Sequence, residues 1–222
     1  HRDLHRVDRR QRQMCIRDRI EWIRQHTPPN TRVCFAGRTV HAYGRGHIAY
    51  LPILTGREML ACDYYHFPTD VVEYEYPPRP WRDNAKGVQA FCELYNIGAF
   101  ITYHEHWKAF FHDHPELFDL GFTHGDIAGF HVKREPRPIM GASGRTWAGF
   151  NRLEIELHED AAEILLPYNW VKGLKASDGI ELFPARQTGD VVLIGVRPKG
   201  VRRFTIRWQS PALWHRLLTR TP

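Results

Sequence analysis

The chain has 222 residues, of which 42% are hydrophobic, 13% are aromatic and 25% are charged, and its formal net charge is +6. This length suits one large domain or two small ones with a proper core, and no segment is of low complexity. No apolar run approaches the roughly 18 residues that a spanning helix needs, so the composition argues against a membrane-spanning segment within this chain.

The first 19 residues differ in character from the rest. They hold seven arginines against three aspartates and show no apolar periodicity, which is typical of a basic disordered arm. Gln13 to Arg19, QMCIRDR, can also be encoded by CAG ATG TGT ATA AGA GAC AGR, which resembles the mosaic-end adapter of transposase-based sequencing libraries. We interpret residues 1–19 as an artefactual or disordered tail. Without them the formal charge falls from +6 to +2, and nucleic acid is not an expected partner.

The stretch 20–37 predicts a short helix followed by a strand. Ile20 and Ile23 fall on one side of a helix over 20–26, which should end before the following Pro-Pro turn. Residues 32–37, RVCFAG, are typical of a buried strand that ends at a glycine.

The clearest helix is predicted over 83–96. Asp83 can cap its start, and Asn96 and Gly98 can close it. Four apolar residues recur at helical spacing, namely Val88, Phe91, Cys92 and Tyr95. A short strand follows over 99–103, and a helix returning into a strand is the repeating unit of a parallel or mixed α/β layer.

A second short helix is predicted from Trp107 to Phe111, ending near His114-Pro115. Residues 117–122 and 127–132 then predict two strands joined by a hairpin-type turn. We therefore expect an α/β domain over 20–135. The next residues are rich in Pro, Gly and charge, which predicts a linker over 136–146.

The stretch 164–185 predicts the centre of a hairpin series. Pro167 cannot donate a ladder hydrogen bond, so its strand should lie at a sheet edge or break there. Residues 152–157 and 203–208 alternate polar with apolar side chains, which predicts strands with one buried face.

Asp190 to Val196 reads as a continuous apolar run and predicts a central strand, and Lys199-Gly200 supplies the turn before the last strand. We expect an antiparallel β-sandwich over 147–209 and a tail or short helix over 210–222. The predicted fold class is an α/β layer followed by an antiparallel β-sandwich, α+β overall.

Three cysteines remain outside the first 19 residues: Cys34, Cys62 and Cys92. They show no paired short spacing, so neither a zinc ribbon nor a disulfide framework is indicated. A bond between Cys34 and Cys62 is one interpretation, and buried free thiols are the favoured one.

Histidine is the sharpest local signal. Six histidines fall between His104 and His131. His104 and His106 on a strand end would present both imidazoles on one face, as metal ligands need, and His112 could add a third. The spacing matches no recognised zinc motif, and histidines beside aromatic residues at a solvated helix edge explain the same pattern. We assign no metal and keep a His-rich metal-dependent enzyme as an alternative.

Two other stretches could contact a ligand. Asp63, Tyr64 and Tyr65 belong to a run of acids and tyrosines that could bind a sugar, although an ordinary loop explains them too. Arg57 follows a glycine, and such a turn can present a guanidinium to an anion; pairing with Glu58 or with an internal carboxylate is the alternative. No serine stands in a Gly-x-Ser-x-Gly frame, so serine hydrolase chemistry is unsupported.

Three segments, 20–33, 51–58 and 94–102, resemble in their order the extracytoplasmic region of bacterial multi-spanning membrane proteins. These relatives are the C-superfamily integral-membrane glycosyltransferases and the YfhO-like membrane proteins. Their β-domain carries a Tyr-x-Trp-x-x-Gly-x-x-Ala motif and a closing Phe-x-x-x-Trp or Tyr strand. The matching residues are Tyr168, Trp170, Gly173, Ala176, Phe204 and Trp208.

The resemblance implies a parent that uses a polyprenyl-phosphate-linked sugar at the extracytoplasmic face of the bacterial cytoplasmic membrane. It assigns no catalytic residue and no cofactor to this fragment, whose partners would be its own missing membrane helices and the lipid-linked sugar. We expect a soluble domain that helps to bind the donor or the acceptor. The expected contacts are Arg57, Asp63, Tyr64, Tyr65 and Trp170. A free-standing carbohydrate-binding or interaction module is an alternative.

Overall fold

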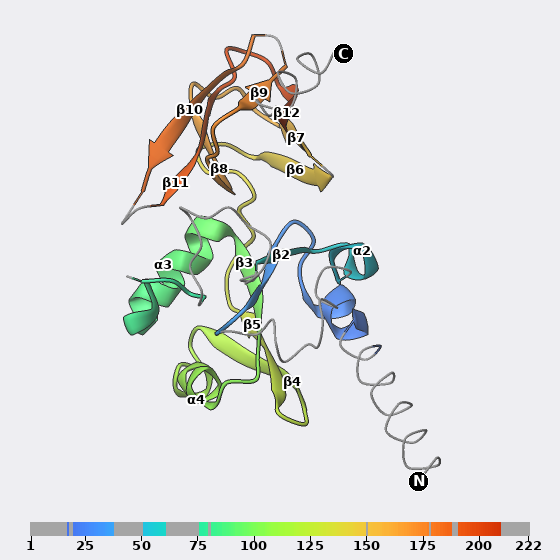
Figure 1. Cartoon of the computed structure of the whole chain (residues 1–222), viewed down its shortest axis with the longest axis vertical. Helices are drawn as coiled ribbons and strands as arrows, with labels where there is room; N and C mark the ends of the chain where they lie inside the picture. The colour runs from blue at the N-terminus through green and yellow to red at the C-terminus, as the bar shows by residue number, and fades with distance from the viewer. Residues whose placement is uncertain are drawn as a thin grey trace, which may run out of the picture. The chain divides into compact units, whose positions relative to one another are not determined.

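The computed structural model describes residues 17, 20–37, 51–60, 76–79, 81–149, 151–177, 179–187 and 191–209. The chain divides into two compact units, His1–Pro136 and Arg137–Pro222 (Figure 1). The first is a mixed α/β layer and the second an antiparallel β-sandwich, so the predicted fold class is confirmed. None of the helices in the described ranges has the length and apolar character that a bilayer crossing requires.

The first unit is built on a five-stranded sheet of order β2-β1-β3-β5-β4. Its strands are β1 (Arg32–Phe35), β2 (Glu58–Leu60), β3 (Ile97–Thr102), β4 (Phe118–His124) and β5 (Ile127–Val132). Strand β1 pairs in parallel with β2 and β3, whereas β5 is antiparallel to both β3 and β4. The β4-β5 hairpin is the one predicted from the sequence.

Helices cover both faces of this sheet (Figure 1). One face meets α3 (Ala85–Tyr95) and α4 (Glu105–Asp113), and the other meets the helical residues 20–26 and α2 (Leu51–Thr55). Strand β1 explains why, because all four of its residues are buried. A strand buried on both faces needs an apolar cover on each side.

Alternate residues of β1 and β3 serve the two faces. Trp22 and Ile23, from the first helix, pack with Val33, Phe35, Ala99 and Ile101. On the opposite face, Phe100 stacks on Phe111 of α4 with ring centroids 4.7 Å apart. The buried residues of α3 are Val88, Phe91, Cys92 and Tyr95, as the helical spacing predicted.

The N-cap of α3 differs from the prediction. Asn84, not Asp83, caps the helix, and its side-chain oxygen accepts a 2.8 Å hydrogen bond from the Gly87 backbone N–H. Asp83 lies one residue too early, in the 3-10 helix η2 (Trp81–Asp83). At the other end Asn96 adopts the left-handed conformation that closes the helix.

A buried arginine fastens the amino end of β1. Arg32 is 7% exposed, and its Nε lies 2.9 Å from Glu58 Oε2 on the neighbouring strand β2. Its Nη1 donates to the carbonyl of Tyr95 at 3.2 Å, at the end of α3. A charge so deeply buried is tolerated only when it is paired and hydrogen-bonded, so Arg32 holds β1, β2 and α3 together.

Cys34 on β1 and Cys92 on α3 are buried free thiols, the interpretation that the sequence favoured. Burial raises the pKa of the Cys34 thiol well above its ordinary value, and the neighbouring Cys92 raises it further. Burial also raises the pKa of Cys92. Cys62 lies outside the described residues.

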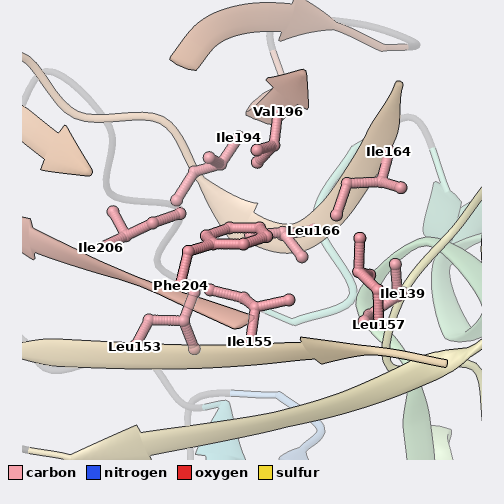
Figure 2. Packing of buried hydrophobic residues seen from close by; sticks show 10 residues of the cluster. All are labelled: Ile139, Leu153, Ile155, Leu157, Ile164, Leu166, Ile194, Val196, Phe204 and Ile206. Carbon is pink, nitrogen blue, oxygen red and sulfur yellow. The ribbon is translucent and has the colours of Figure 1, made fainter. Parts of the chain in front are cut away.

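The second unit contains two packed sheets. One has the order β10-β11-β8 and the other the order β6-β7-β12-β9. Their strands are β6 (Gly144–Gly149), β7 (Arg152–Leu157), β8 (Ile164–Asn169), β9 (Leu174–Ala176), β10 (Glu181–Arg186), β11 (Val192–Arg197) and β12 (Arg203–Trp208). Aliphatic side chains from β7 and β8 and from β11 and β12 meet around Phe204 in the core (Figure 2).

Several local features agree with the sequence pattern. Strand β8, which contains Pro167, lies at a sheet edge, and β11 is the central strand of the same sheet. Lys199 and Gly200 both have positive φ, at 52° and 84°, and form the turn that carries the chain from β11 to β12 in the other sheet. Within the range expected as a linker, Ile139 already belongs to the sandwich core and β6 begins at Gly144.

An aromatic cluster fixes the first helix on its sheet. The Trp22 indole lies 4.7 Å from the ring of His131 on β5 and 5.9 Å from that of His26. The two imidazoles are 5.8 Å apart. Partial burial, and secondarily the charge of His26, lower the pKa of His131, while Asp119 on β4 opposes the shift.

This cluster predicts that acid weakens the first unit. Because the folded-state pKa of His131 lies below its ordinary value of 6.5, the unfolded chain binds the proton first as the pH falls. The stabilising contribution is therefore complete above pH 6.5 and is lost below it. Urea unfolding between pH 8 and pH 5 should show this loss, and His131→Gln should reduce it. An unchanged pH dependence in His131→Gln would contradict the assignment.

The sandwich core predicts a second effect. Leu166 is 0% exposed, so Leu166→Ala should lower the free energy of unfolding by about 2–5 kcal/mol through lost burial and a residual cavity. Val171 is 43% exposed in the same unit, and Val171→Ala should change the stability by less than about 0.5 kcal/mol. Denaturant titration of both variants checks the difference, and equal losses would refute this core.

Candidate functional site

The candidate site lies where β1 and β3 end side by side. Beyond the last strand residues, the Ala36 N–H donates to the Ile101 carbonyl at 3.0 Å. The Thr102 hydroxyl, which is fully buried, donates to the Ala36 carbonyl at 3.0 Å. The same hydroxyl accepts the His104 backbone N–H at 3.1 Å. Thr102 thus joins the carboxyl ends of the two strands and fixes the chain that leads to His104.

The imidazole of His104 packs directly on Gly37, which has no side chain. Gly37 has a φ of 81°, and its N–H donates to the Tyr76 carbonyl at 2.8 Å. A Cβ at this position would lie 2.2 Å from His104 Cδ2 and 2.7 Å from Nε2. The ring therefore occupies the space that any side chain at residue 37 would fill, which explains the glycine at the end of this strand.

His104 retains an unused hydrogen-bonding atom. Its Nε2 is buried and has no hydrogen-bond partner among the described residues. Its ring lies 4.1 Å from the ring of Tyr103. As the N-cap of α4 it makes no side-chain capping bond, although its carbonyl accepts the Lys108 N–H at 3.0 Å. Buried polar atoms nearly always have a hydrogen-bond partner, so we expect this nitrogen to have one.

The topology of the sheet draws attention to the same place. From β1 the chain proceeds to β2 on one side, and from β2 it proceeds through α3 to β3 on the other side of β1. The strand order therefore reverses between β1 and β3. In open α/β sheets, ligands bind outside the carboxyl ends of the strands at such a switch point. Gly37 and His104 lie there.

The alternative of a metal site placed His104 and His106 together on a strand end, and the structure places them differently. Helix α4 begins at Glu105, so His106 lies in its first turn and not on a strand end beside His104. His112 is an exposed residue of the last turn, with its ring 5.3 Å from Phe130. Within the described ranges, no group of three His, Cys, Asp or Glu side chains could hold a metal ion. Of the three histidines, only His104 belongs to the candidate site.

Arg57 is engaged by the first helix. Its Nε donates to the Thr27 carbonyl at 3.0 Å and its Nη2 to the Arg24 carbonyl at 3.2 Å. These carbonyls lie at the end of the helix, where a cation satisfies otherwise unpaired acceptors. Desolvation lowers the pKa of Arg57. Its Nη1 donates to the Gly56 carbonyl at 3.3 Å, so all three guanidinium nitrogens are engaged and the side chain secures α2 and β2 to the first helix.

The remaining predicted contacts are Asp63, Tyr64, Tyr65 and Trp170. Asp63, Tyr64 and Tyr65 lie outside the described residues. Trp170 follows β8 in the sandwich unit, where its side chain packs against the core and its backbone N–H donates to the Val192 carbonyl at 2.7 Å. The other residues of its motif are in this unit too. The Gly173 carbonyl accepts the Gln209 N–H, and Trp208 Nε1 donates to the Lys172 carbonyl.

Sequence reasoning did not single out Gly37 or Thr102. The sequence does contain a signal for Gly37, because RVCFAG predicts a buried strand that ends at a glycine. The pairing of β1 with β3, the strand before His104, joins residues far apart in the sequence and leaves no local signal.

No protein-family model matches this chain, and neither a curated protein nor a solved structure matches it.

Because His104 packs on Gly37, alanine at residue 37 should reduce the stability more than alanine at a glycine with open space around it. Gly37→Ala should destabilise the first unit by about 2–4 kcal/mol, through the positive φ and displacement of the imidazole. Gly125 also has a positive φ, of 55°, but a Cβ there would meet nothing within 4 Å. Gly125→Ala should therefore lose only the conformational part, about 1 kcal/mol. Urea unfolding measures both, and equal losses would argue against the contact.

Proposed function

We propose that this chain is a soluble extracytoplasmic domain of a membrane glycosyltransferase-like protein and that it helps to bind a lipid-linked sugar. The observation that carries the proposal is that Nε2 of His104, at the switch point between β1 and β3, has no hydrogen-bond partner in the part of the chain that the structure describes. The role is binding, with no catalytic residue and no cofactor assigned to this part of the protein.

The chemistry of the site suits a sugar phosphate. An imidazole can donate a hydrogen bond to a phosphate oxygen or exchange one with a sugar hydroxyl. His104 also marks the start of α4, where free backbone N–H groups favour an anion. The adjacent Tyr103 adds an aromatic ring, and such rings pack well on the apolar face of a sugar.

The order of the segments supports the membrane-bound parent. The segments that resemble the extracytoplasmic regions of these membrane proteins include α2, the start of β2 and the transition from α3 to β3. In this proposal the partners are the membrane helices of the parent and the prenyl-phosphate sugar, and the domain works at the outer face of the bacterial cytoplasmic membrane. Nucleic acid is not a proposed partner.

A binding titration tests the role of His104. The full chain, titrated with a short-chain prenyl-phosphate sugar, should show saturable shifts of the His104 and Tyr103 ring signals in NMR spectra. His104→Phe keeps a ring against Gly37 and removes both nitrogens. It should weaken binding by about tenfold or more, the value of a lost hydrogen bond to a charged group.

His106→Ala is the matched control, since His106 is exposed one residue into the same helix and should bind as the wild type does. If neither His104 nor Tyr103 responds to the sugar phosphate, the proposal is refuted. Equal binding of the free sugar would favour the alternative of a carbohydrate-binding module.

A further inference from the structure

One face of the sandwich unit is unusually basic. In the sheet β6-β7-β12-β9, Leu153, Ile155, Phe204 and Ile206 point into the core. Because side chains alternate along a strand, the residues between them point outward. The outward residues of β7 and β12 include Arg152, Glu154, Glu156, Arg203, Thr205 and Arg207.

The strand register arranges these outward side chains in rows. In the first row, Glu156 is flanked by Arg145 of β6 and Arg203 of β12. In the second row, Glu154 is flanked by Trp147 and Thr205. In the third row, Arg207 stands opposite Lys175 of β9.

Arg152 lies at the same end of the face as the third row. Its inward neighbour Leu153 pairs with Ile206, the inward neighbour of Arg207. Cations of three adjacent strands, β7, β12 and β9, therefore gather at this end.

The rows differ in how their charges are balanced. In the first row, Arg203 Nη2 lies 2.6 Å from Glu156 Oε1. Arg152 Nε lies 3.1 Å from Glu154 Oε1 on its own strand. Arg207 and Lys175, in contrast, have no acidic partner among the described residues, although they face each other directly. Like charges in directly opposed positions destabilise a sheet, so this pair needs a compensating anion from outside.

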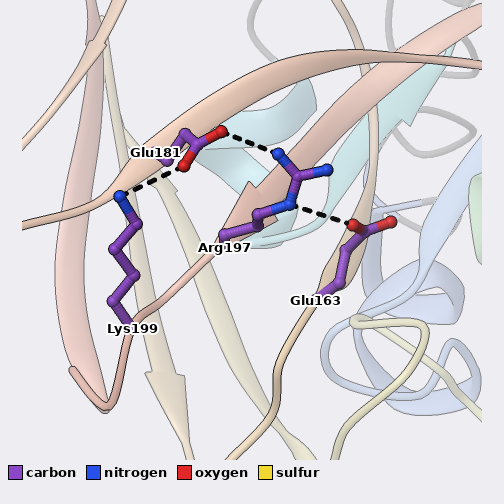
Figure 3. A network of polar contacts seen from close by, with 4 residues as sticks. All are labelled: Glu163, Glu181, Arg197 and Lys199. Atoms are coloured by element: carbon purple, nitrogen blue, oxygen red, sulfur yellow. Dashed lines mark hydrogen bonds and ion pairs between the residues drawn. The ribbon is translucent and has the colours of Figure 1, made fainter.

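The other sheet of the same unit shows the usual alternative. There Arg197 lies 2.7 Å from Glu181 and 3.3 Å from Glu163, and Lys199 lies 3.1 Å from Glu181 (Figure 3). Two cations meet two carboxylates in that network, so its charge is neutral. The basic sheet face has five cations against two carboxylates in the described residues, which leaves a clear positive excess.

Trp147 adds a large apolar group to the basic face. It is 45% exposed, although tryptophan is normally among the most buried side chains. Its strand neighbour Arg145 and its cross-strand neighbour Glu154 point the same way. An exposed indole on a basic face is a composition that proteins use at a membrane interface, where the ring sits at the level of the headgroups.

We propose that this basic face, formed by Arg145, Trp147, Arg152, Lys175, Arg203 and Arg207, docks on an anionic lipid surface. A sheet face presents its cations across several strands at once, which suits the many phosphates of a bilayer. The inference rests on the proposed function only in that the parent holds this domain beside a membrane. The charge and the exposed indole of the basic face are properties of this chain and do not depend on the proposed function.

A nucleic acid fits this face less well. Proteins that bind single strands stack successive bases on several aromatic rings, whereas Trp147 is the one aromatic residue among the outward-facing positions of the described rows. One exposed indole on a face with a positive excess matches a single interfacial anchor.

Vesicle binding tests the proposal. The full chain should sediment with phosphatidylglycerol vesicles but not with phosphatidylcholine vesicles, and less so as salt is added. Removing one cation should weaken binding about fivefold, so Lys175→Gln combined with Arg207→Gln should weaken it about 25-fold. Trp147→Ser should weaken it further and reduce quenching of tryptophan fluorescence by brominated lipid.

The matched control removes two cations from the balanced network. Arg197→Gln combined with Lys199→Gln causes the same loss of charge, but it should reduce binding less than about threefold. All variants keep the seven arginines of residues 1–19, so differences between them report on the sandwich unit. Circular dichroism confirms that each variant is folded.

Three outcomes would overturn the proposal. These are no binding to anionic vesicles, equal losses in the two double variants, and binding of single-stranded DNA or RNA with the same residue dependence but none to vesicles. The sugar-phosphate titration monitors His104, which is in the other unit. Failure of the vesicle test therefore leaves the proposed function intact, and failure of the titration leaves the lipid-docking proposal intact.

Discussion

The first unit depends on the complete burial of β1. A strand of four buried residues needs a partner strand on each edge and an apolar layer on each face, and the order of the other elements follows from these needs. Arg32 makes the arrangement possible at the amino end, because Glu58 and the end of α3 compensate its charge. At the carboxyl end, β1 and β3 are neighbours in the sheet although they are far apart in the sequence. Their pairing places His104, which follows β3, against Gly37, which follows β1.

Local pattern was sufficient for much of the secondary structure. The alternation over 152–157 and 203–208 matches β7 and β12 to the residue, because one buried face imposes a period of two. The buried face of α3 followed from its helical spacing for the same reason. The cap was misplaced by one residue because Asp83 and Asn84 are both good capping residues. Only the 3-10 turn before the helix selects between them.

The candidate site was beyond local pattern. In the sequence alone, His104 and His106 are both compatible with a strand end. In the structure, β3 ends at Thr102 and α4 begins at Glu105. Arg57 carried the right chemistry for an anion, yet the unpaired carbonyls of the first helix engage it. The contact between Gly37 and His104 depends on the parallel pairing of distant strands. No short-range signal contains that pairing.

The buried thiols of Cys34 and Cys92 have a consequence for how such a domain could mature. A thiol attacks a disulfide as the thiolate, and the raised pKa of both groups keeps them protonated at neutral pH. Once folded, they react poorly with oxidants and with disulfide-exchanging catalysts. These two cysteines therefore behave as small apolar residues, and the α/β unit needs no oxidative folding step to complete their environment.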